Sequence, residues 1–497
     1  MQNIFLDSRK LDRYAREHFF LTEDSMIENV SAALEREISP HLFHESGRYI
    51  SRPCVLILAG PGNNGADGYA LARRIVSRDV SVAVCCVREP ETESARLQRR
   101  RAESLGVLIL NPCELDSFAE EKSFDIAAVV DCIYGAGFHL PLDEVPAAVI
   151  GCANNIEAFK AACDVPSGLD ALGNGGTVFR ADVTVCAGAL KLSLFSDKAK
   201  DFCGRIAVCS LGISRSGFEA AFQADAFLLE KSEMKLPFRT DPNVHKGSFG
   251  HVAVVCGEKR GAAELASSAA FGFGTGLVTL AGTDHSSLMH IMASMEIPEK
   301  ANAVVLGCGL GRTGSAAVSG LKFLSEGKKT ACVLDADIFY YKEIRGFLES
   351  RNSAETVLTP HPKEFSVLLE QCGLGAYSAE ETVEKRIELV KKFCSQYRNC
   401  VLLLKGSVTV IGMWKKSENR PAVYFNPYGT ASLAKGGTGD VLSGLIASLL
   451  AQGYDGMNAA VTASLAHSFA SREFRNSFSL TPQGLIEKIQ SFDWEVL

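Results

Sequence analysis

Short apolar runs alternate with longer amphipathic stretches along almost the whole chain. The runs are rich in valine and isoleucine, and the stretches between them have the spacing of amphipathic helices. This alternation is typical of parallel sheets that are covered by helices on both faces. We therefore predict an α/β protein, with strands near 55–59, 82–87, 107–110, 126–131, 161–163, 183–187 and 206–210 in the first half and near 252–256, 278–281, 303–306, 332–335, 401–404 and 408–411 in the second.

Residues 212–242 interrupt this alternation. The stretch mixes charged and turn-forming residues and has no clear strand period. A chain of 497 residues is also too long for one ordinary hydrophobic core, so two or three domains are expected. We place a domain junction near residue 215.

Composition and charge narrow the choice of partner and compartment. The formal net charge of −7 argues against nucleic acid as the main partner. The first twenty residues lack an apolar core, and no later run reaches the roughly 18 apolar residues of a membrane span. We expect a cytoplasmic protein with no membrane partner. The 16 cysteines include no Cys-x-x-Cys pair, so we expect reduced, buried thiols rather than zinc sites.

A glycine-rich turn follows the first predicted strand, at residues 60–68, and leads into an amphipathic helix. Its glycines let backbone N–H groups approach a ligand, and the helix N-terminus favours an anion. Asp67 would repel a phosphate, so we expect it to cap backbone amides or to orient a sugar hydroxyl. Asn64, Asp131 and Ser167 follow different strands. If they gather at one edge of the sheet, their oxygens would suit a hard monovalent cation.

The motifs G-x-G-N-N-G-x-D-G, V-D-x-x-x-G-x-G and D-x-P-S-G-L-D occur here in that order. Together they resemble the NAD(P)H-hydrate epimerase domain, which implies a Rossmann-like three-layer domain over 1–214. The resemblance implies potassium at Asn64, Asp131 and Ser167, and Asp164 as the acid/base of epimerisation. Ala66 stands where the family usually has glycine. The substrate contacts implied are Asn63, Asn64, Gly65, Ala66, Asp67, Gly135, Ala136, Gly137, Phe138, His139, Leu140, Pro141 and Asp164.

A second glycine-rich turn, with Gly436, Gly437 and Gly439, precedes a long apolar helix in the C-terminal half. Successive N–H groups there can enclose a transferring phosphoryl group. Asp440, in the first helical turn, is placed to take a proton from the attacking hydroxyl. The alternative is that Asp440 only stabilises the helix start, worth about 0.3–1 kcal/mol. Capping would leave the flanking glycines without a purpose.

This turn resembles the anion hole of the ribokinase-like fold. With the motifs at 245–250, 307–311, 334–337, 359–365 and 404–410, it looks like ADP-dependent NAD(P)H-hydrate dehydratase over 225–497. The resemblance implies a ribokinase-like α/β domain. It places the nucleotide at Lys405, Gly406, Ser407, Val408, Thr409 and Gly439, and the hydrated cofactor at Ala263, Gly309, His361 and Asp440. By its position between two prolines, His361 is expected to contact the ligand, although it could instead bond to backbone.

The implied reaction is phosphorylation of the ring hydroxyl of NADHX or NADPHX by ADP, followed by loss of phosphate. Magnesium would screen the phosphate charges. We also expect a homo-oligomer. Two alternatives stay open on the residues alone. The anion hole would serve a sugar or vitamin-precursor kinase equally well, and the N-terminal half could be a ligand-binding or assembly module.

Overall fold

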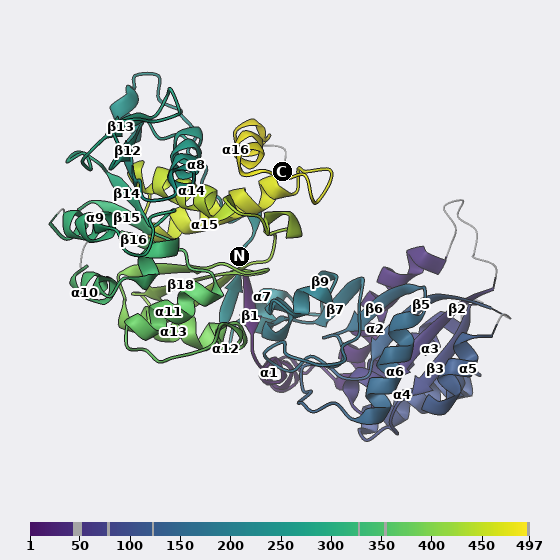
Figure 1. Cartoon of the computed structure of the whole chain (residues 1–497). Coiled ribbons are helices and arrows are strands. Elements are labelled where there is room, and N and C mark those ends of the chain that lie inside the picture. Colours follow the sequence, from purple (N-terminus) through teal and green to yellow (C-terminus); the bar gives the residue numbers. More distant parts are fainter. Residues whose placement is uncertain (43–51, 77–79, 122–123, 327–328, 352–354, 495–497) are drawn as a thin grey trace. The chain divides into compact units, whose positions relative to one another are not determined.

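The computed structural model describes residues 1–42, 52–76, 80–121, 124–326, 329–351 and 355–494 (Figure 1). By its internal contacts the chain divides into two compact units. One is Asn3–Ala226, and the other joins Met1–Gln2 to Phe227–Leu497. The functional limits 1–214 and 225–497 stay predictions. Within the described residues, no helix combines the length and the apolar character needed to cross a membrane.

The N-terminal unit is built on a parallel sheet of order β4-β3-β2-β5-β6-β7-β9. Each strand predicted in this half has its counterpart. A short parallel pair formed by β1 and β8 was not predicted. The strands are β1 (Gln2–Phe5), β2 (Pro53–Ala59), β3 (Ser81–Cys86), β4 (Leu108–Leu110), β5 (Asp125–Cys132), β6 (Phe159–Cys163), β7 (Val183–Ala187), β8 (Leu190–Lys191) and β9 (Arg205–Cys209).

Helices cover both faces of this sheet, because its central strands are apolar on both sides. Every residue of β2 is buried. Leu56 and Leu58 belong to one cluster with residues of α5 and α6, whereas Ile57 faces α3 near Gly68. The three-layer prediction is confirmed. The helices are α1 (Arg9–Phe19), α2 (Glu23–Ile38), α3 (Asn63–Val76), α4 (Glu93–Ser104), α5 (Leu115–Ala119), α6 (Glu144–Asn155) and α7 (Arg215–Glu219).

The C-terminal unit has strand order β13-β12-β11-β14-β15-β16-β17-β18-β19-β10. Its strands are parallel except where β18 runs antiparallel to β17 and β19. The prediction of no strand in 212–242 was wrong, because β10 lies there and pairs with β19. Strands β13, β16 and β19 were also missed. The strands are β10 (Ala226–Leu228), β11 (His251–Val255), β12 (Leu277–Ala281), β13 (Met292–Ser294), β14 (Ala303–Leu306), β15 (Ala331–Leu334), β16 (Thr356–Leu358), β17 (Cys400–Leu404), β18 (Thr409–Lys415) and β19 (Arg420–Asn426).

This sheet also lies between two helical layers, and the α/β prediction is confirmed. Val305 belongs to the core with α8, α14 and α15, whereas its neighbour Leu306 faces Gly320 of α9. Helix α14 comes so close to α8 that a methyl on Gly444 would lie 2.2 Å from the carbonyl oxygen of Ala266. That packing holds the start of α14 at the sheet. The helices are α8 (Arg260–Gly272), α9 (Ser315–Glu326), α10 (Glu343–Ser350), α11 (Pro362–Gln371), α12 (Ala379–Glu384), α13 (Arg386–Gln396), α14 (Thr438–Ala451), α15 (Gly456–Ser471) and α16 (Pro482–Ser491).

Candidate active sites

Helix α14 begins with donors left open for an anion. Its N-cap is Gly437, at φ 93°, and among the described residues no side chain caps the first turn. A methyl group on Gly437 would lie 2.7 Å from Cγ of Pro482 and 3.0 Å from Leu265, in a backbone region that disfavours other residues. Glycine is therefore required here. The unpaired N–H groups and the helix dipole together form a site for a negatively charged group.

Thr438 and His467 brace this helix start from behind. Oγ1 of Thr438 donates to the carbonyls of Leu433 and Lys435, each at 2.9 Å. Nε2 of His467, on α15, lies 3.0 Å from the carbonyl oxygen of Thr438. Burial lowers the pKa of His467 to about 4. The ring is therefore neutral near pH 7, and Nε2 must carry the proton that it donates to this carbonyl.

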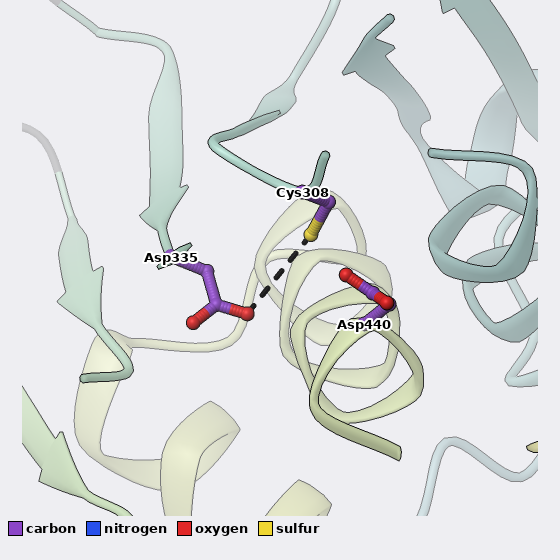
Figure 2. A group of neighbouring side chains, drawn as sticks. All are labelled: Cys308, Asp335 and Asp440. Atoms are coloured by element: carbon purple, nitrogen blue, oxygen red, sulfur yellow. Dashed lines mark hydrogen bonds between the residues drawn. The ribbon is translucent and has the colours of Figure 1, made fainter. Parts of the chain in front are cut away.

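Asp440 and Asp335 face each other beside the helix start (Figure 2). Asp440 lies in the first turn of α14, and Asp335 follows β15. Oδ2 of Asp335 accepts a hydrogen bond from Oγ of Ser443 at 2.8 Å. Burial and the neighbouring Asp335 raise the pKa of Asp440 to about 6. Asp440 is thus a carboxylate near pH 7 and basic enough to act as a general base.

Lys405 provides the positive charge of this site. It follows β17, and its Nζ donates to Oδ1 of Asp335 at 2.8 Å and lies 3.7 Å from Glu364. Burial opposes the lysine charge, but Asp335 and Glu364 outweigh it and raise the pKa of Lys405. A methyl on Gly439 would lie 3.4 Å from Nζ. The ammonium group therefore lies beside Gly439, in the first turn of α14.

His361 caps α11 through a reciprocal pair with Glu364. Nδ1 of His361 accepts a hydrogen bond from the backbone N–H of Glu364 at 3.3 Å, and the backbone N–H of His361 donates to Oε2 of Glu364 at 2.8 Å. The imidazole thus accepts a hydrogen bond from the backbone, yet 46% of the His361 side chain is exposed. Burial raises the pKa of Glu364 to about 7. Contact of His361 with a ligand stays a prediction that this geometry permits.

The remaining predicted residues of this half lie around the same sheet edge. Gly309, at φ 62°, approaches the start of α8, where a methyl would lie 2.5 Å from the carbonyl of Lys259. Ala263 is fully buried in the core, so none of its atoms is exposed to a ligand in this structure. The segment 405–409 forms the turn between β17 and β18, and Gly406 and Ser407 are exposed in it while the side chain of Val408 is buried. Their roles stay predictions.

In the N-terminal unit, Asp131 and Ser167 form one buried network. Oδ1 of Asp131 accepts from Oγ of Ser167 at 2.7 Å, and Oδ2 accepts from the backbone N–H of Ser167 at 2.7 Å. Burial raises the pKa of Asp131 to about 6. Asn64 lies in the first turn of α3, which follows β2, and β2 and β6 flank β5. The three predicted cation ligands therefore lie at or just beyond the ends of three adjacent strands, with Asp131 among the last residues of β5.

Asp164 is held in a strained conformation at the same edge. It is one of few non-glycine residues with a left-handed backbone, at φ 66°. Oδ2 accepts from the N–H of Ala136 at 3.0 Å, and Oδ1 accepts from Ala187 at 3.2 Å and forms an ion pair with buried Lys191. A methyl on Gly135 would lie 2.9 Å from Oδ2. Gly135 thus lets the carboxylate reach the loop.

The other predicted epimerase residues divide into buried and exposed groups. Ala66 is fully buried and packs with Ile27, Ala70 and Ala95, so its methyl points into the helical layer and away from the turn. Asp67 is buried too; burial and the charge of Asp164 raise its pKa well above the usual range, and Sγ of Cys163 donates to it at 3.6 Å. Asp67 thus accepts a hydrogen bond from a thiol, whereas we expected it to cap backbone amides or to orient a sugar hydroxyl. Exposed or half-exposed are Asn63, Gly137, Phe138, His139, Leu140 and Pro141.

Several residues of these sites were not predicted from the sequence. Lys191 pairs with the predicted Asp164, and Glu364 lies near the predicted Lys405. Ser443 bonds to Asp335 and His467 to the backbone of Thr438, two residues that were not predicted either. These partners lie far apart in the chain, and only the bond of Glu364 to His361 follows a local spacing, that of a helix-capping pair. Only the apolar surroundings of Lys191, in a segment that reads as a buried strand, could have marked it.

The chain matches two family models. Residues 252–491 match the model described as NAD(P)H-hydrate dehydratase, and residues 23–193 match the YjeF-related protein N-terminus. The Bifunctional NAD(P)H-hydrate repair enzyme Nnr of Helicobacter pylori is 37% identical over 496 residues, which cover 99% of this chain and 100% of the relative. The chain belongs to the bifunctional NAD(P)H-hydrate repair enzymes.

Other members of the repair enzyme family extend this similarity. The enzyme of Coxiella burnetii is 32% identical and covers 84% of both chains. A solved ADP/ATP-dependent NAD(P)H-hydrate dehydratase from Bacillus subtilis is 23% identical, covers 53% of this chain and 96% of its own, and has a TM-score of 0.45, too low to support a conclusion. The predicted family and enzyme class are confirmed by the full-length relatives. Membership decides against the small-molecule kinase that the anion hole alone left open.

Proposed function

We propose that the chain repairs hydrated nicotinamide cofactors with two active sites. The N-terminal unit interconverts the R and S epimers of NADHX and NADPHX. The C-terminal unit dehydrates the S epimer with ADP and releases NAD(P)H, AMP and phosphate. The observation that carries this proposal is Asp440, a half-buried base in the first turn of α14 whose ionisation is influenced by the nearby ammonium of Lys405.

In the dehydratase site, Asp440 takes the proton of the ring hydroxyl as its oxygen attacks the terminal phosphorus of ADP. The new P–O bond forms while the bond to AMP breaks. The N–H groups of α14 and Nζ of Lys405 stabilise the negative charge that develops on the phosphoryl oxygens. The ring nitrogen then expels phosphate, and loss of a proton from the adjacent ring carbon restores the double bond. Phosphate leaves far more readily than hydroxide.

The nucleotide is proposed to lie along Lys405, Gly406, Ser407, Val408, Thr409 and Gly439. The hydrated cofactor is proposed to contact His361 and Gly309, and Ala263 only if binding exposes it. The exposed turn between β17 and β18 and the half-exposed imidazole support these positions. All of them surround the carboxyl edge of one sheet, where ligands bind in open α/β folds.

Magnesium finds no ready set of protein ligands here. Within the described residues, Cys308, Asp335 and Asp440 come close enough to hold a metal ion. A thiol does not suit Mg²⁺, and the ammonium of Lys405 already neutralises Asp335. These residues do not fit a magnesium site. Magnesium that accompanies ADP would be held by the phosphates and by water.

The residues predicted for potassium fit such an ion. Nδ2 of Asn64 is buried and has no hydrogen-bond partner in the described part of the chain. Turning the amide over would put its oxygen in that position. The buried carboxylate of Asp131 and the hydroxyl of Ser167 supply further oxygens. A bound potassium ion would offset the charge of Asp131 and attract the anionic phosphates of the substrate.

In the epimerase site, Asp164 is proposed to exchange a proton with the hydrated ring. Its oxygens are oriented by Ala136, Ala187 and Lys191. Contacts with the substrate are proposed from Asn63 to Asp67 and from Gly135 to Pro141, with Ala66 contributing only backbone atoms. We further propose a homo-oligomer in the cytoplasm, which light scattering and fractionation would test.

The test uses chemically prepared NADHX, which contains both epimers, with ADP and magnesium. Regenerated NADH is followed by its absorbance. The wild-type chain should restore NADH from both epimers. Asp440→Asn should abolish recovery while it leaves epimer exchange, followed by chromatography, intact. Asp164→Asn should restore NADH from the S epimer, while the R epimer should react only as fast as it converts spontaneously to S. Wild-type phosphorylation of a simple alcohol, with no recovery of NADH, would refute the proposal.

A further inference from the structure

Cys308 lies between the two carboxylates of the dehydratase site (Figure 2). It follows β14 and is fully buried. Its Sγ donates to Oδ2 of Asp335 at 4.0 Å. One side-chain atom of each of the three residues lies within 4.8 Å of the others. The thiol therefore lies close to the proposed base as well as to Asp335.

The turn around Cys308 fixes the direction of its side chain. Gly307 has φ 130°, and a methyl group there would lie 1.6 Å from the carbonyl oxygen of Asp335. Gly309 also packs closely against the start of α8, where a methyl group would lie 2.5 Å from the carbonyl oxygen of Lys259. The backbone of Cys308 is therefore clamped between β15 and α8, and its position leaves Sγ little freedom to turn away from Asp335 and Asp440.

The thiol keeps its proton in this position. Burial, Asp335 and Asp440 together raise the pKa of Cys308 well above its usual range. A protonated thiol is a poor metal ligand and a poor nucleophile, so neither role suits Cys308. What a protonated thiol can do between two carboxylates is donate a hydrogen bond.

The other charged groups around Asp440 also affect how readily its carboxyl group ionises. Asp335 and Asp337, which follow β15, both disfavour its ionised form, whereas Lys405 at the end of β17 favours it. The hydrogen bond from Cys308 also favours the ionised form. A neutral donor in this position reduces the repulsion that two facing carboxylates would otherwise feel.

We propose that Cys308 is a positioning residue of the dehydratase, whose S–H donates into the space between Asp335 and Asp440 and holds Asp440 ready to accept the substrate's hydroxyl proton. This inference rests on the proposed function of Asp440 as the base. It assigns to the cysteine neither metal binding nor covalent chemistry. A residue that only filled space at this position would donate no hydrogen bond and would not affect the ionisation of Asp440.

Cys308→Ala removes the donor, and Cys308→Ser keeps one in nearly the same volume. The test is the pH profile of ADP-dependent dehydration for both variants. In Cys308→Ala the acid limb should move to higher pH. A shift of about one unit would lower the rate about fivefold near pH 6 and by only about a tenth near pH 8. Cys308→Ser should follow the wild-type profile. The fluorescence of Trp414 and Trp494, which lie in the same unit as Cys308, controls for folding.

A second measurement does not depend on activity. The infrared difference between wild type and Cys308→Ala isolates one S–H stretching band among the chain's 16 cysteines. The same difference taken in an Asp440→Asn background should show this band at higher frequency, because an amide oxygen accepts more weakly than a carboxylate. An unmoved band overturns the inference, as does an acid limb that stays in place in Cys308→Ala. If the wild type fails to dehydrate NADHX, the proposed function fails, and the infrared band alone decides the role of Cys308.

Discussion

Nζ of Lys405 lies 2.8 Å from Oδ1 of Asp335 and beside the position that a methyl on Gly439 would occupy. One ammonium group thus joins the sheet edge to the N-terminus of α14. Lys405→Met keeps the length of the side chain and removes its charge. We expect the dehydration rate to fall about 100-fold or more, since one preorganised donor to a developing negative charge is worth that much. Steady-state kinetics with NADHX and ADP would measure the loss.

Lys416→Met is the matched control for Lys405→Met. Lys416 is exposed in the turn between β18 and β19. Lys416→Met should leave the dehydration rate within about twofold of wild type, as expected for surface substitutions. Equal losses in both variants would show that charge at Lys405 has no special role.

Dehydration should depend on a single carboxylate at acid pH. Burial and Asp335 raise the pKa of Asp440 to about 6. The base acts as a carboxylate, so activity should be full well above pH 6 and should fall as pH drops through that value. Asp440→Asn should show no dehydration at any pH in this range. A wild-type rate that stays constant between about pH 7 and pH 5 would contradict the role of Asp440.

The strands that flank the sites could be predicted because burial on both faces makes them apolar. Strand β16 is a run of only three residues between polar positions, and β19 begins with the half-exposed Arg420 and Pro421, so neither is a long apolar run. The glycine turns and Asp440 are visible in the sequence because their chemistry is local. The ion pairs Lys405–Asp335 and Lys191–Asp164 join distant segments, and only the folded sheets bring those residues together.

His467 should make the stability of the C-terminal unit depend on pH. Its folded pKa, about 4, lies below the ordinary value of 6.5. The unfolded chain therefore binds the proton more readily. This part of the stability is fully present above about pH 6.5 and is lost as pH falls towards 4, on the order of 3 kcal/mol in all. His467→Gln cannot titrate and should show a shallower acid loss.

The unfolding measurement can be confined to this unit. Both tryptophans of the chain, Trp414 and Trp494, lie in it, so urea unfolding followed by their fluorescence reports on it directly. His285→Gln, at an exposed position, is the control and should retain the wild-type pH dependence. Identical slopes in wild type and His467→Gln would contradict the role given to the buried ring.

Lys191 should be needed for both the stability and the activity of the epimerase unit. Its side chain is only 2% exposed and pairs with Asp164. Lys191→Met leaves a largely buried carboxylate without its partner, which costs about 3–5 kcal/mol. The double variant with Asp164→Asn should regain most of that stability, because the unpaired charge is gone. Calorimetry would measure both, with exposed Lys198→Met as the control. A double variant no more stable than Lys191→Met would contradict the ion pair's importance.

Gly437 should be irreplaceable at the anion site for reasons beyond backbone strain. Gly437→Ala places a methyl 2.7 Å from Pro482 at φ 93°, so the start of α14 must shift. Gly453, just beyond the end of the same helix, has φ 92°, and a methyl there would meet no described atom within 4 Å, so Gly453→Ala carries the strain alone. Both variants should lose about 1 kcal/mol or more of stability.

Only Gly437→Ala should also weaken ADP binding and slow dehydration, because displaced N–H groups no longer meet the phosphoryl group. Isothermal titration with ADP and the NADH assay would separate the two effects, and equal ADP affinity in both variants would count against the anion site.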